Sequence, residues 1–371
     1  MVYRTLGRTG LRVSQLGFGA MRLPMIGSGT EARIDRDRAI PMIHRAFESG
    51  VNYIDTAVGY CNQDSQRVVG EALKGWRERV IVSTKNHDYG EDEKTWWSLL
   101  EQSLERLQVS SIDIYNHHGI TWSAYTEKVE PRLAGWMREA QRQGLIKHIC
   151  CSFHDTSDAL LKLVASGYPS VVTVQYNMLD RRLEEGIAAA HAAGIGIVAM
   201  GPVAGGRLGD HSAVLADLVP GIARIPELAL RFVLANPHIS VALSGMGSLE
   251  MVEENIRIAA DPVALSAADQ AAVDAHLKRL GKLADLYCTG CNYCLPCPQG
   301  VSIPRIFECY NRGRVYGLWT SARQGYAAIG ASEADADKRA DACVDCGACE
   351  AKCPQHIRIR EHLREADAAL R

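Results

Sequence analysis

Two short runs hold most of the thiols of this chain. Eight of its 12 cysteines fall in "CTGCNYCLPCPQG" (288–300) and "CVDCGACEAKCP" (343–354). The second run is spaced C-x2-C-x2-C-x3-C-P, the bacterial pattern in which three cysteines hold one [4Fe–4S] cluster and the fourth serves a neighbouring cluster. The two runs therefore predict a module with two [4Fe–4S] clusters.

The pattern also predicts which cysteine belongs to which cluster. One cluster is assigned to Cys288, Cys291, Cys294 and Cys353, and the other to Cys343, Cys346, Cys349 and Cys297. Cys297 comes one residue earlier than the pattern requires. Zinc and disulfides are the alternatives. Four-cysteine zinc sites use two separated C-x2-C pairs, and a long chain without a secretion signal favours reduced thiols over disulfides.

A second set of reactive side chains stands at the ends of apolar runs. Asp55 ends "VNYIDTA" and Lys85 ends "RVIVSTK". Tyr60 follows Asp55 by five residues, and His118 ends "IDIYNHH". A phenol with a pKa of about 10 is a weak acid, but a nearby ammonium lowers that pKa and a carboxylate keeps the ammonium charged. With a neutral imidazole to polarise a carbonyl, these groups predict general acid catalysis that reduces C=O or oxidises an alcohol.

Each of these residues has a structural alternative. Asp55 could cap a helix or turn, Tyr60 could be a half-buried core residue, and Lys85 could be a solvated strand end. His117 and His118 are adjacent, so we expect one of them to point into the wall. Their joint position at successive strand ends favours the catalytic interpretation.

The elements that must position these groups form an α/β pattern. Eight short runs rich in Val and Ile read as buried parallel strands, at 16–21, 51–57, 79–85, 112–118, 146–152, 171–177, 194–200 and 239–245. Amphipathic stretches lie between them. In one of these, 93–109, Trp97, Leu100, Leu104 and Leu107 are predicted to share the buried face. Eight such units predict a (β/α)8 TIM barrel rather than an open sheet, because "GFGAMRLPMIG" lacks the Gly-rich fingerprint of the latter.

Composition changes near residue 281. Strand patterns stop there while Cys, Pro and Gly become frequent, so we expect a TIM barrel over 1–280 and a small ferredoxin-like iron–sulfur domain over 281–371. The net charge of −2 and the absence of a basic stripe argue against nucleic acid, and no apolar stretch reaches the length of a transmembrane helix. With no signal peptide expected, we predict a cytoplasmic protein.

Over about residues 1–280 the chain resembles the aldo/keto reductases. The resemblance rests on "YRTLGRTGLRVSQLGFGAMRLP", "NYIDTAVGY", "VSTK", "DIYNHH", "VQYN", "ALRFVL" and "EENI". It implies a barrel that uses NADP or NAD without a Rossmann fold, with Asp55, Tyr60, Lys85 and His118 as the catalytic tetrad. "SFHD" and "CTGCNYCLPCPQGVSIP" further resemble a subgroup with a C-terminal ferredoxin-like domain.

The same resemblance implies the residues that contact the cofactor. They are Met21, Ser152, Gln175, Gly201, Pro202, Gly206, Leu208, Ser244, Gly245, Glu254 and Asn255. Met200 stands where an aromatic residue often stacks on the nicotinamide, and Gly245 and Met251 stand where basic residues often hold the 2′-phosphate. The choice between NADP and NAD is therefore open. His154 is either an active-site residue or a neighbour of a helix cap at Asp155.

Two functions remain. The first is an oxidoreductase that transfers a hydride between the nicotinamide and a small-molecule carbonyl or alcohol. A hydride carries two electrons, so this reaction needs no one-electron cluster. The second is an electron-transfer or redox-sensing protein, in which the clusters exchange electrons with a redox partner protein and the barrel is a substrate or docking site. Neither the substrate nor the oligomeric state is readable from the chain.

Overall fold

The computed structural model describes most of the chain. The described residues are 1–27, 31–88, 92–209, 212–216, 218–262, 265–284, 288, 294–332, 335–353 and 357–371. They form two compact units, one of Met1–Gly205 with Ala229–Leu265 and one of Gly206–Leu228 with Ser266–Arg371. Among these residues, no helix is both long and apolar enough to span a membrane.

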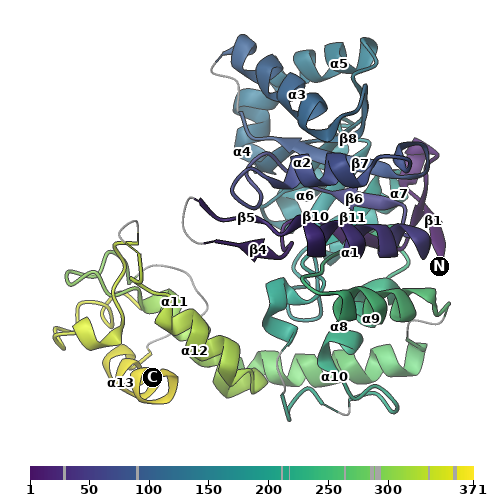
Figure 1. Ribbon diagram of the computed structural model, residues 1–371. Coiled ribbons are helices and arrows are strands. Elements are labelled where there is room, and N and C mark those ends of the chain that lie inside the picture. Colours follow the sequence, from purple (N-terminus) through teal and green to yellow (C-terminus); the bar gives the residue numbers. More distant parts are fainter. Residues whose placement is uncertain are drawn as a thin grey trace. The chain divides into compact units, whose positions relative to one another are not determined.

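The first unit is a closed barrel of parallel strands, as predicted (Figure 1). Its strands are β3 (Leu16–Gly19), β6 (Tyr53–Asp55), β7 (Ile81–Asn86), β8 (Ile112–Ile120), β9 (Ile146–Phe153), β10 (Val171–Gln175), β11 (Gly196–Met200) and β12 (Val241–Gly245). They are hydrogen-bonded in this order, and β12 pairs with β3 to close the ring. The eight apolar runs of the sequence each supply one strand.

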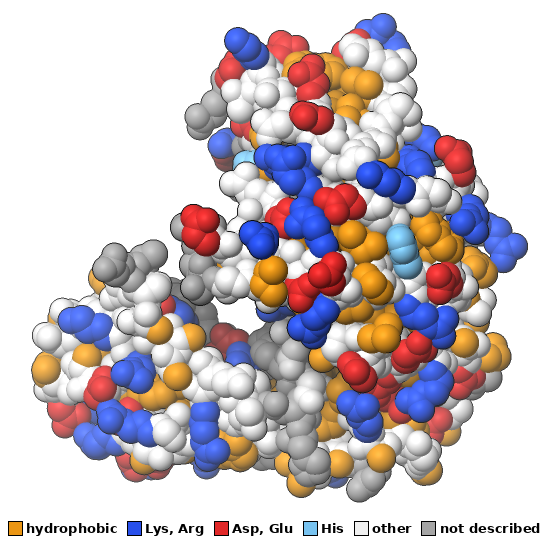
Figure 2. All heavy atoms as spheres, viewed as in Figure 1, with side chains coloured by type: hydrophobic (Ala, Val, Ile, Leu, Met, Phe, Trp, Pro, Cys, Tyr) orange, Lys and Arg blue, Asp and Glu red, His pale blue; other side chains and the backbone are white. Residues whose placement is uncertain are grey.

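Helices connect successive strands and cover the barrel. They are α1 (Arg36–Glu48), α2 (Ser65–Ala72), α3 (Glu93–Leu107), α4 (Trp122–Ala124) with a π-helical stretch Tyr125–Leu133, α5 (Ala134–Arg142), α6 (Ser157–Ala165), α7 (Glu184–Ala192), α8 (Ile225–Ala235) and α9 (Leu249–Ala260). The side chains of Asp92, Thr156 and Ser248 accept hydrogen bonds from the first backbone N–H groups of α3, α6 and α9. On the face seen in Figure 2, Lys and Arg are interspersed with Asp and Glu.

An N-terminal hairpin closes the amino end of the barrel. β1 (Tyr3–Thr5) and β2 (Arg12–Ser14) pair antiparallel. Leu6 and Val13 are fully buried and pack with residues at the starts of the strands, among them Tyr53 and Val171. Because apolar side chains fill this end, the polar side chains of the strands gather at the carboxyl end. A second hairpin, β4 (Met25–Ile26) with β5 (Arg33–Ile34), follows β3.

The buried face of α3 agrees with the prediction at Leu100 and Leu107 and differs from it at Trp97 and Leu104. Trp96 is fully buried and Trp97 is only half-buried, and the face continues through Leu100, Ser103 and Leu107. A polar residue belongs to this face because the Ser103 hydroxyl donates to the carbonyl of Leu99 and accepts from Gln66 Nε2. The spacing of apolar residues alone therefore predicted Trp97 and Leu104 on the buried face, one residue after Trp96 and Ser103.

The second unit is helical around the cysteine runs. Its helices are α10 (Ala267–Ala284), α11 (Ile303–Tyr316), α12 (Trp319–Ala327) and α13 (Ile359–Leu370). They bury a core that includes Ile306, Phe307, Tyr326 and Leu363. This unit begins before residue 281 and takes in Gly206–Leu228. The boundaries of the compact units thus differ from the change in composition near residue 281. The domain limits 1–280 and 281–371 stay a prediction.

Candidate functional site

The four predicted catalytic residues lie at the carboxyl ends of neighbouring strands. Asp55 is the last residue of β6, and Tyr60 lies in the turn that follows it. Lys85 is the penultimate residue of β7, and His118 lies near the end of β8. Because these strands are adjacent in the barrel, the side chains meet at one end.

Asp55 and Lys85 form a buried ion pair. Lys85 Nζ donates to Asp55 Oδ1, and each side chain is only 2 % exposed. The remaining polar atoms of the pair are also satisfied. Lys85 Nζ donates to the carbonyl oxygen of Thr56 at 2.9 Å, and Ser83 Oγ donates to Asp55 Oδ2 at 2.7 Å. A buried pair with such partners holds the lysine charged and in one orientation.

Tyr60 lies between the lysine and the histidine. Lys85 Nζ is 5.0 Å from the centroid of the Tyr60 ring. The rings of Tyr60 and His118 meet edge to face with 6.0 Å between their centroids. The structure therefore brings all four predicted residues together.

The protonation of Tyr60 differs from the expectation based on the lysine alone. Burial raises the pKa of Tyr60, and although the Lys85 charge lowers it, burial and the Asp55 charge prevail. For Lys85, burial by itself would lower the pKa, but the charges of Asp55 and Tyr60 and their hydrogen bonds outweigh it, so the pKa is raised. At neutral pH the phenol is protonated and the amine is charged, so the proton to be donated is present.

His118 is neutral at this site. Burial, and then the charges of Lys85, His87 and His154, lower its pKa to about 4. The adjacent His117 points into the wall, as expected for one of the pair. It is buried, and its Nε2 lies 2.8 Å from the hydroxyl oxygen of Tyr168.

These buried neutral imidazoles predict acid sensitivity. The pKa of His118 is lowered to about 4 and that of His117 to about 3 by burial, against about 6.5 in an unfolded chain. As pH falls from about 6.5 towards 4, the unfolded state takes up protons that the folded state does not, so stability falls. We expect the urea midpoint to drop between pH 7 and pH 5, and His118→Gln to reduce that drop. An identical drop in both proteins would contradict the assignment.

His87 and His154 are two further histidines beside this site. His87 follows β7 and His154 follows β9. Their positions just past the ends of strands are the feature of the sequence that could have identified them as site residues. The cap at α6 is Thr156, which rules out Asp155 as its cap. His154 Nε2 instead lies 3.5 Å from Ser152 Oγ, and burial and the Lys85 charge lower the pKa of His154. The helix-cap alternative at Asp155 is therefore wrong, and the active-site role of His154 stays a prediction.

Several predicted cofactor contacts also lie at the carboxyl ends of strands. Ser152 is buried near the end of β9, and Gln175 ends β10. Gly201 has a positive φ of 65°, and a Cβ there would lie 2.5 Å from Gln175 Nε2, so glycine permits this close approach. Asn255 Nδ2 donates to Ser244 Oγ at 3.0 Å, which ties α9 to the end of β12. This arrangement fits a nicotinamide dinucleotide.

The other predicted contacts are less tightly grouped. Met21 is 54 % exposed after β3, Gly245 is exposed at the end of β12, and Glu254 is half-buried on α9. Pro202 is buried in the loop after β11. Two more, Gly206 and Leu208, belong to the second compact unit.

The second unit brings Cys297 to the second cysteine run. One pocket is lined by Cys297, Cys343, Cys346 and Cys349, the four residues assigned to one cluster. Among the described residues, no three His, Cys, Asp or Glu side chains converge as ligands of a single metal ion. A [4Fe–4S] cubane has its irons at separate corners, so its thiolates must surround a cavity. The thiol donors around this pocket fit such a cluster.

The other predicted cluster is described only in part. Cys294 is buried in the core of the second unit, and Cys288 and Cys353 pack against that core half-buried. Cys291 lies outside the described residues. Three of the four assigned ligands therefore border one core.

Two protein families match this chain. The Aldo/keto reductase family matches residues 15–221, and the 4Fe-4S dicluster domain matches residues 287–357. Aldo-keto reductase AKR11C1 from Bacillus halodurans, in its holo form, is 28 % identical with a TM-score of 0.63, covering 74 % of this chain and 96 % of that one. An aldo-keto reductase from Klebsiella pneumoniae in complex with NADPH is 25 % identical with a TM-score of 0.60, covering 74 % and 95 %.

A curated relative is similar over the same part of the chain. The NADH-specific methylglyoxal reductase of Escherichia coli is 28 % identical over an alignment of 317 residues, and the match covers 71 % of this chain and 94 % of the relative. The family match spans more than half of the residues and agrees with the barrel and with the grouping of Asp55, Tyr60, Lys85 and His118. The chain therefore belongs to the aldo/keto reductase family and carries a 4Fe–4S dicluster domain in its C-terminal part.

Proposed function

We propose that the barrel catalyses the NAD(P)-dependent reduction of a small-molecule carbonyl or the oxidation of the corresponding alcohol. The observation that carries this proposal is the protonated Tyr60 phenol held between a charged Lys85 and a neutral His118. When bound, the nicotinamide supplies or accepts the hydride. The protein supplies the proton and the orientation.

Each side chain has a distinct role in this proposal. Tyr60 donates its hydroxyl proton to the carbonyl oxygen, and the Lys85 charge stabilises the phenolate that forms. Asp55 keeps Lys85 charged and fixed through their ion pair. His118, being neutral, can donate a hydrogen bond that orients the carbonyl. In alcohol oxidation the same groups run in reverse, and Tyr60 receives the proton.

For the cofactor we propose NADP or NAD, held by the eleven contact residues predicted from the sequence. The Klebsiella relative is in complex with NADPH, and the Escherichia relative is NADH-specific. Gly245 and Met251 supply no charge for a 2′-phosphate. The side chain of Arg22, however, packs against Gly245, where a Cβ would lie 2.9 Å from Arg22 Cγ. The aliphatic part of Arg22 therefore lies beside this position.

An anaerobic screen tests the proposal directly. Carbonyl and alcohol substrates are offered with each nicotinamide, and absorbance at the nicotinamide band is followed. We expect turnover with at least one carbonyl–alcohol pair. Nicotinamide binding without turnover on any substrate class would count against the enzyme and favour the alternative function.

We further propose two [4Fe–4S] clusters, with the ligand sets given above, in a domain over 281–371. Purified anaerobically, the protein is expected to be brown and to contain about eight irons per chain, four for each cluster. Iron and zinc are measured by plasma emission. Two or fewer irons, or stoichiometric zinc, would overturn the assignment. Since thiolate ligands require a reducing compartment, we propose a cytoplasmic location.

The alternative is an electron-transfer or redox-sensing role with a redox partner protein. It is favoured by the presence of clusters that a two-electron hydride reaction does not need. Cys346→Ala with Cys349→Ala separates the two functions, provided that the variant is folded. Unchanged NAD(P)H-dependent turnover in the variant would show that the clusters are not required for the barrel reaction.

A further inference from the structure

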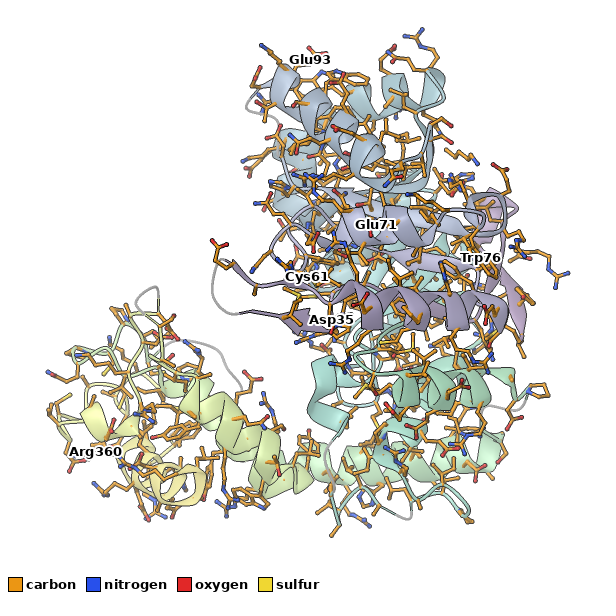
Figure 3. All side chains as sticks on the ribbon, viewed as in Figure 1. Asp35, Cys61, Glu71, Trp76, Glu93 and Arg360 are labelled. Carbon is orange, nitrogen blue, oxygen red and sulfur yellow. The ribbon has the colours of Figure 1, made fainter. Side chains whose placement is uncertain are left out.

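One pocket of the second unit is lined in part by the second cysteine run. It is lined by four cysteines and by apolar side chains such as Val301, Ile303 and Leu363. Of the described residues that line it, Arg360 alone carries a charge. Arg360 lies in the first turn of α13 and is labelled in Figure 3.

Arg360 is held against the cysteine segment by several hydrogen bonds. Its Nε donates to Glu350 Oε2 at 3.0 Å and its backbone N–H donates to Glu350 Oε1 at 2.9 Å. Its Nη1 donates to the carbonyl oxygen of Asp345 at 3.2 Å. Because both partners lie within the second cysteine run, the guanidinium is fixed relative to the thiols.

A glycine between the cysteines lies beside the guanidinium. Gly347 has a positive φ of 73°, and a Cβ on it would lie 3.6 Å from Arg360 Cζ. The acidic partner of Arg360 is placed differently, because Glu350 does not line the pocket. Of this ion pair, Arg360 therefore borders the pocket and Glu350 does not.

The charge matters for a cluster bound here. A [4Fe–4S] cluster with four thiolates is anionic, and its one-electron reduction adds one further negative charge. A fixed cation at the wall stabilises the reduced form more than the oxidised form, and net charge near a cluster is one determinant of its potential. The Arg360 side chain is 38 % exposed, so solvent screens part of this interaction and the remainder acts across the apolar lining of the pocket.

We infer that Arg360 raises the reduction potential of the cluster assigned to Cys297, Cys343, Cys346 and Cys349. The residue acts on the cluster through its charge and is not a ligand. The inference rests on the proposed cluster assignment and is independent of the barrel reaction. Iron analysis of the parent protein separates failure of the assignment from failure of the inference.

The test is a redox titration of the anaerobically purified full chain. Dithionite supplies electrons through mediators, and the reduced clusters are followed by electron paramagnetic resonance. Arg360→Gln is expected to lower the potential of one cluster and to move the other less. Arg360→Lys keeps the charge and is expected to restore most of the potential.

Arg364→Gln is the matched control. Arg364 lies one turn further along α13 and binds Asp345 Oδ1 at 3.1 Å, but it does not line the pocket. Its replacement is expected to shift the potential much less. Equal shifts in Arg360→Gln and Arg364→Gln, or no shift in either, would overturn the inference.

A second variant, with the opposite expected shift in reduction potential, keeps the test decisive if Arg360→Gln loses its cluster. Glu350→Gln removes the carboxylate that offsets the guanidinium, so it is expected to raise the potential of the same cluster. If Arg360→Gln does not retain its iron, this variant and Arg360→Lys decide the question. A potential in Glu350→Gln at or below that of the parent would then refute the role of Arg360.

Discussion

Replacing Tyr60 by phenylalanine is expected to lower kcat for carbonyl reduction by about 10²–10⁴-fold, the usual contribution of a positioned general acid. The ring stays, so its packing against His118 and its position near Lys85 are retained. Only the hydroxyl that carries the proton is lost. Nicotinamide binding is expected to be nearly unchanged, because Ser152 and Gln175, two of the predicted cofactor contacts, are untouched.

Two measurements make this prediction specific. Binding of the reduced nicotinamide is followed by fluorescence, and turnover is measured with the substrate found in the screen. Tyr3→Phe is the matched control. Tyr3 lies in the hairpin at the other end of the barrel, and its hydroxyl donates to the carbonyl oxygen of Gly50. Turnover that survives in Tyr60→Phe, or that falls equally in Tyr3→Phe, would remove Tyr60 from the mechanism.

Replacing Lys85 by methionine is expected to destabilise the protein by about 3–5 kcal/mol, the usual cost of leaving one buried charge without its partner. Asp55 and Lys85 are each only 2 % exposed, so water cannot replace the lost ammonium at Asp55. The same change removes the cation beside the Tyr60 ring, so carbonyl reduction is expected to be lost as well. Urea unfolding measures the first effect and a turnover assay measures the second.

A double variant distinguishes the ion pair from simple packing. Lys85→Met combined with Asp55→Leu removes both charges, and stability is expected to recover in part while activity does not. Arg45→Met is the control, because the pair between Arg45 and Glu253 is exposed and such a pair contributes about 0–1 kcal/mol. If Lys85→Met costs no more than Arg45→Met, the buried pair is not a determinant of stability.

Local pattern was sufficient to predict the barrel and the grouping of four side chains at one end of it. Buried parallel strands are short, apolar runs, and each of the eight runs is a strand of the closed barrel. Because parallel strands share the direction of their carboxyl ends, residues such as Asp55 and Lys85 were predictable neighbours from their positions alone. The cysteine pattern was equally local, since its spacing is a property of the loop that wraps a cluster.

Other features depended on contacts between distant segments. The predicted buried face of α3 included Trp97 and Leu104, whereas Trp96 and Ser103 are buried instead. Ser103 can be buried because its hydroxyl accepts a hydrogen bond from Gln66 on α2. The pKa of Tyr60 is raised and not lowered, because burial by the surrounding elements outweighs Lys85. The pKa of Tyr60 thus combines contributions from residues far apart in the chain, and a short sequence motif does not contain them.

By itself, the sequence determined the order of the strands, the identity of the four groups at their ends and the thiols of the C-terminal part, because each depends on spacing within a short segment. Only the tertiary structure decided that Tyr60 stays protonated and that Arg360 borders the pocket shared by Cys297 and the second run. These depend on burial and on charges brought together by folding, and both are properties of the packed chain rather than of its local sequence.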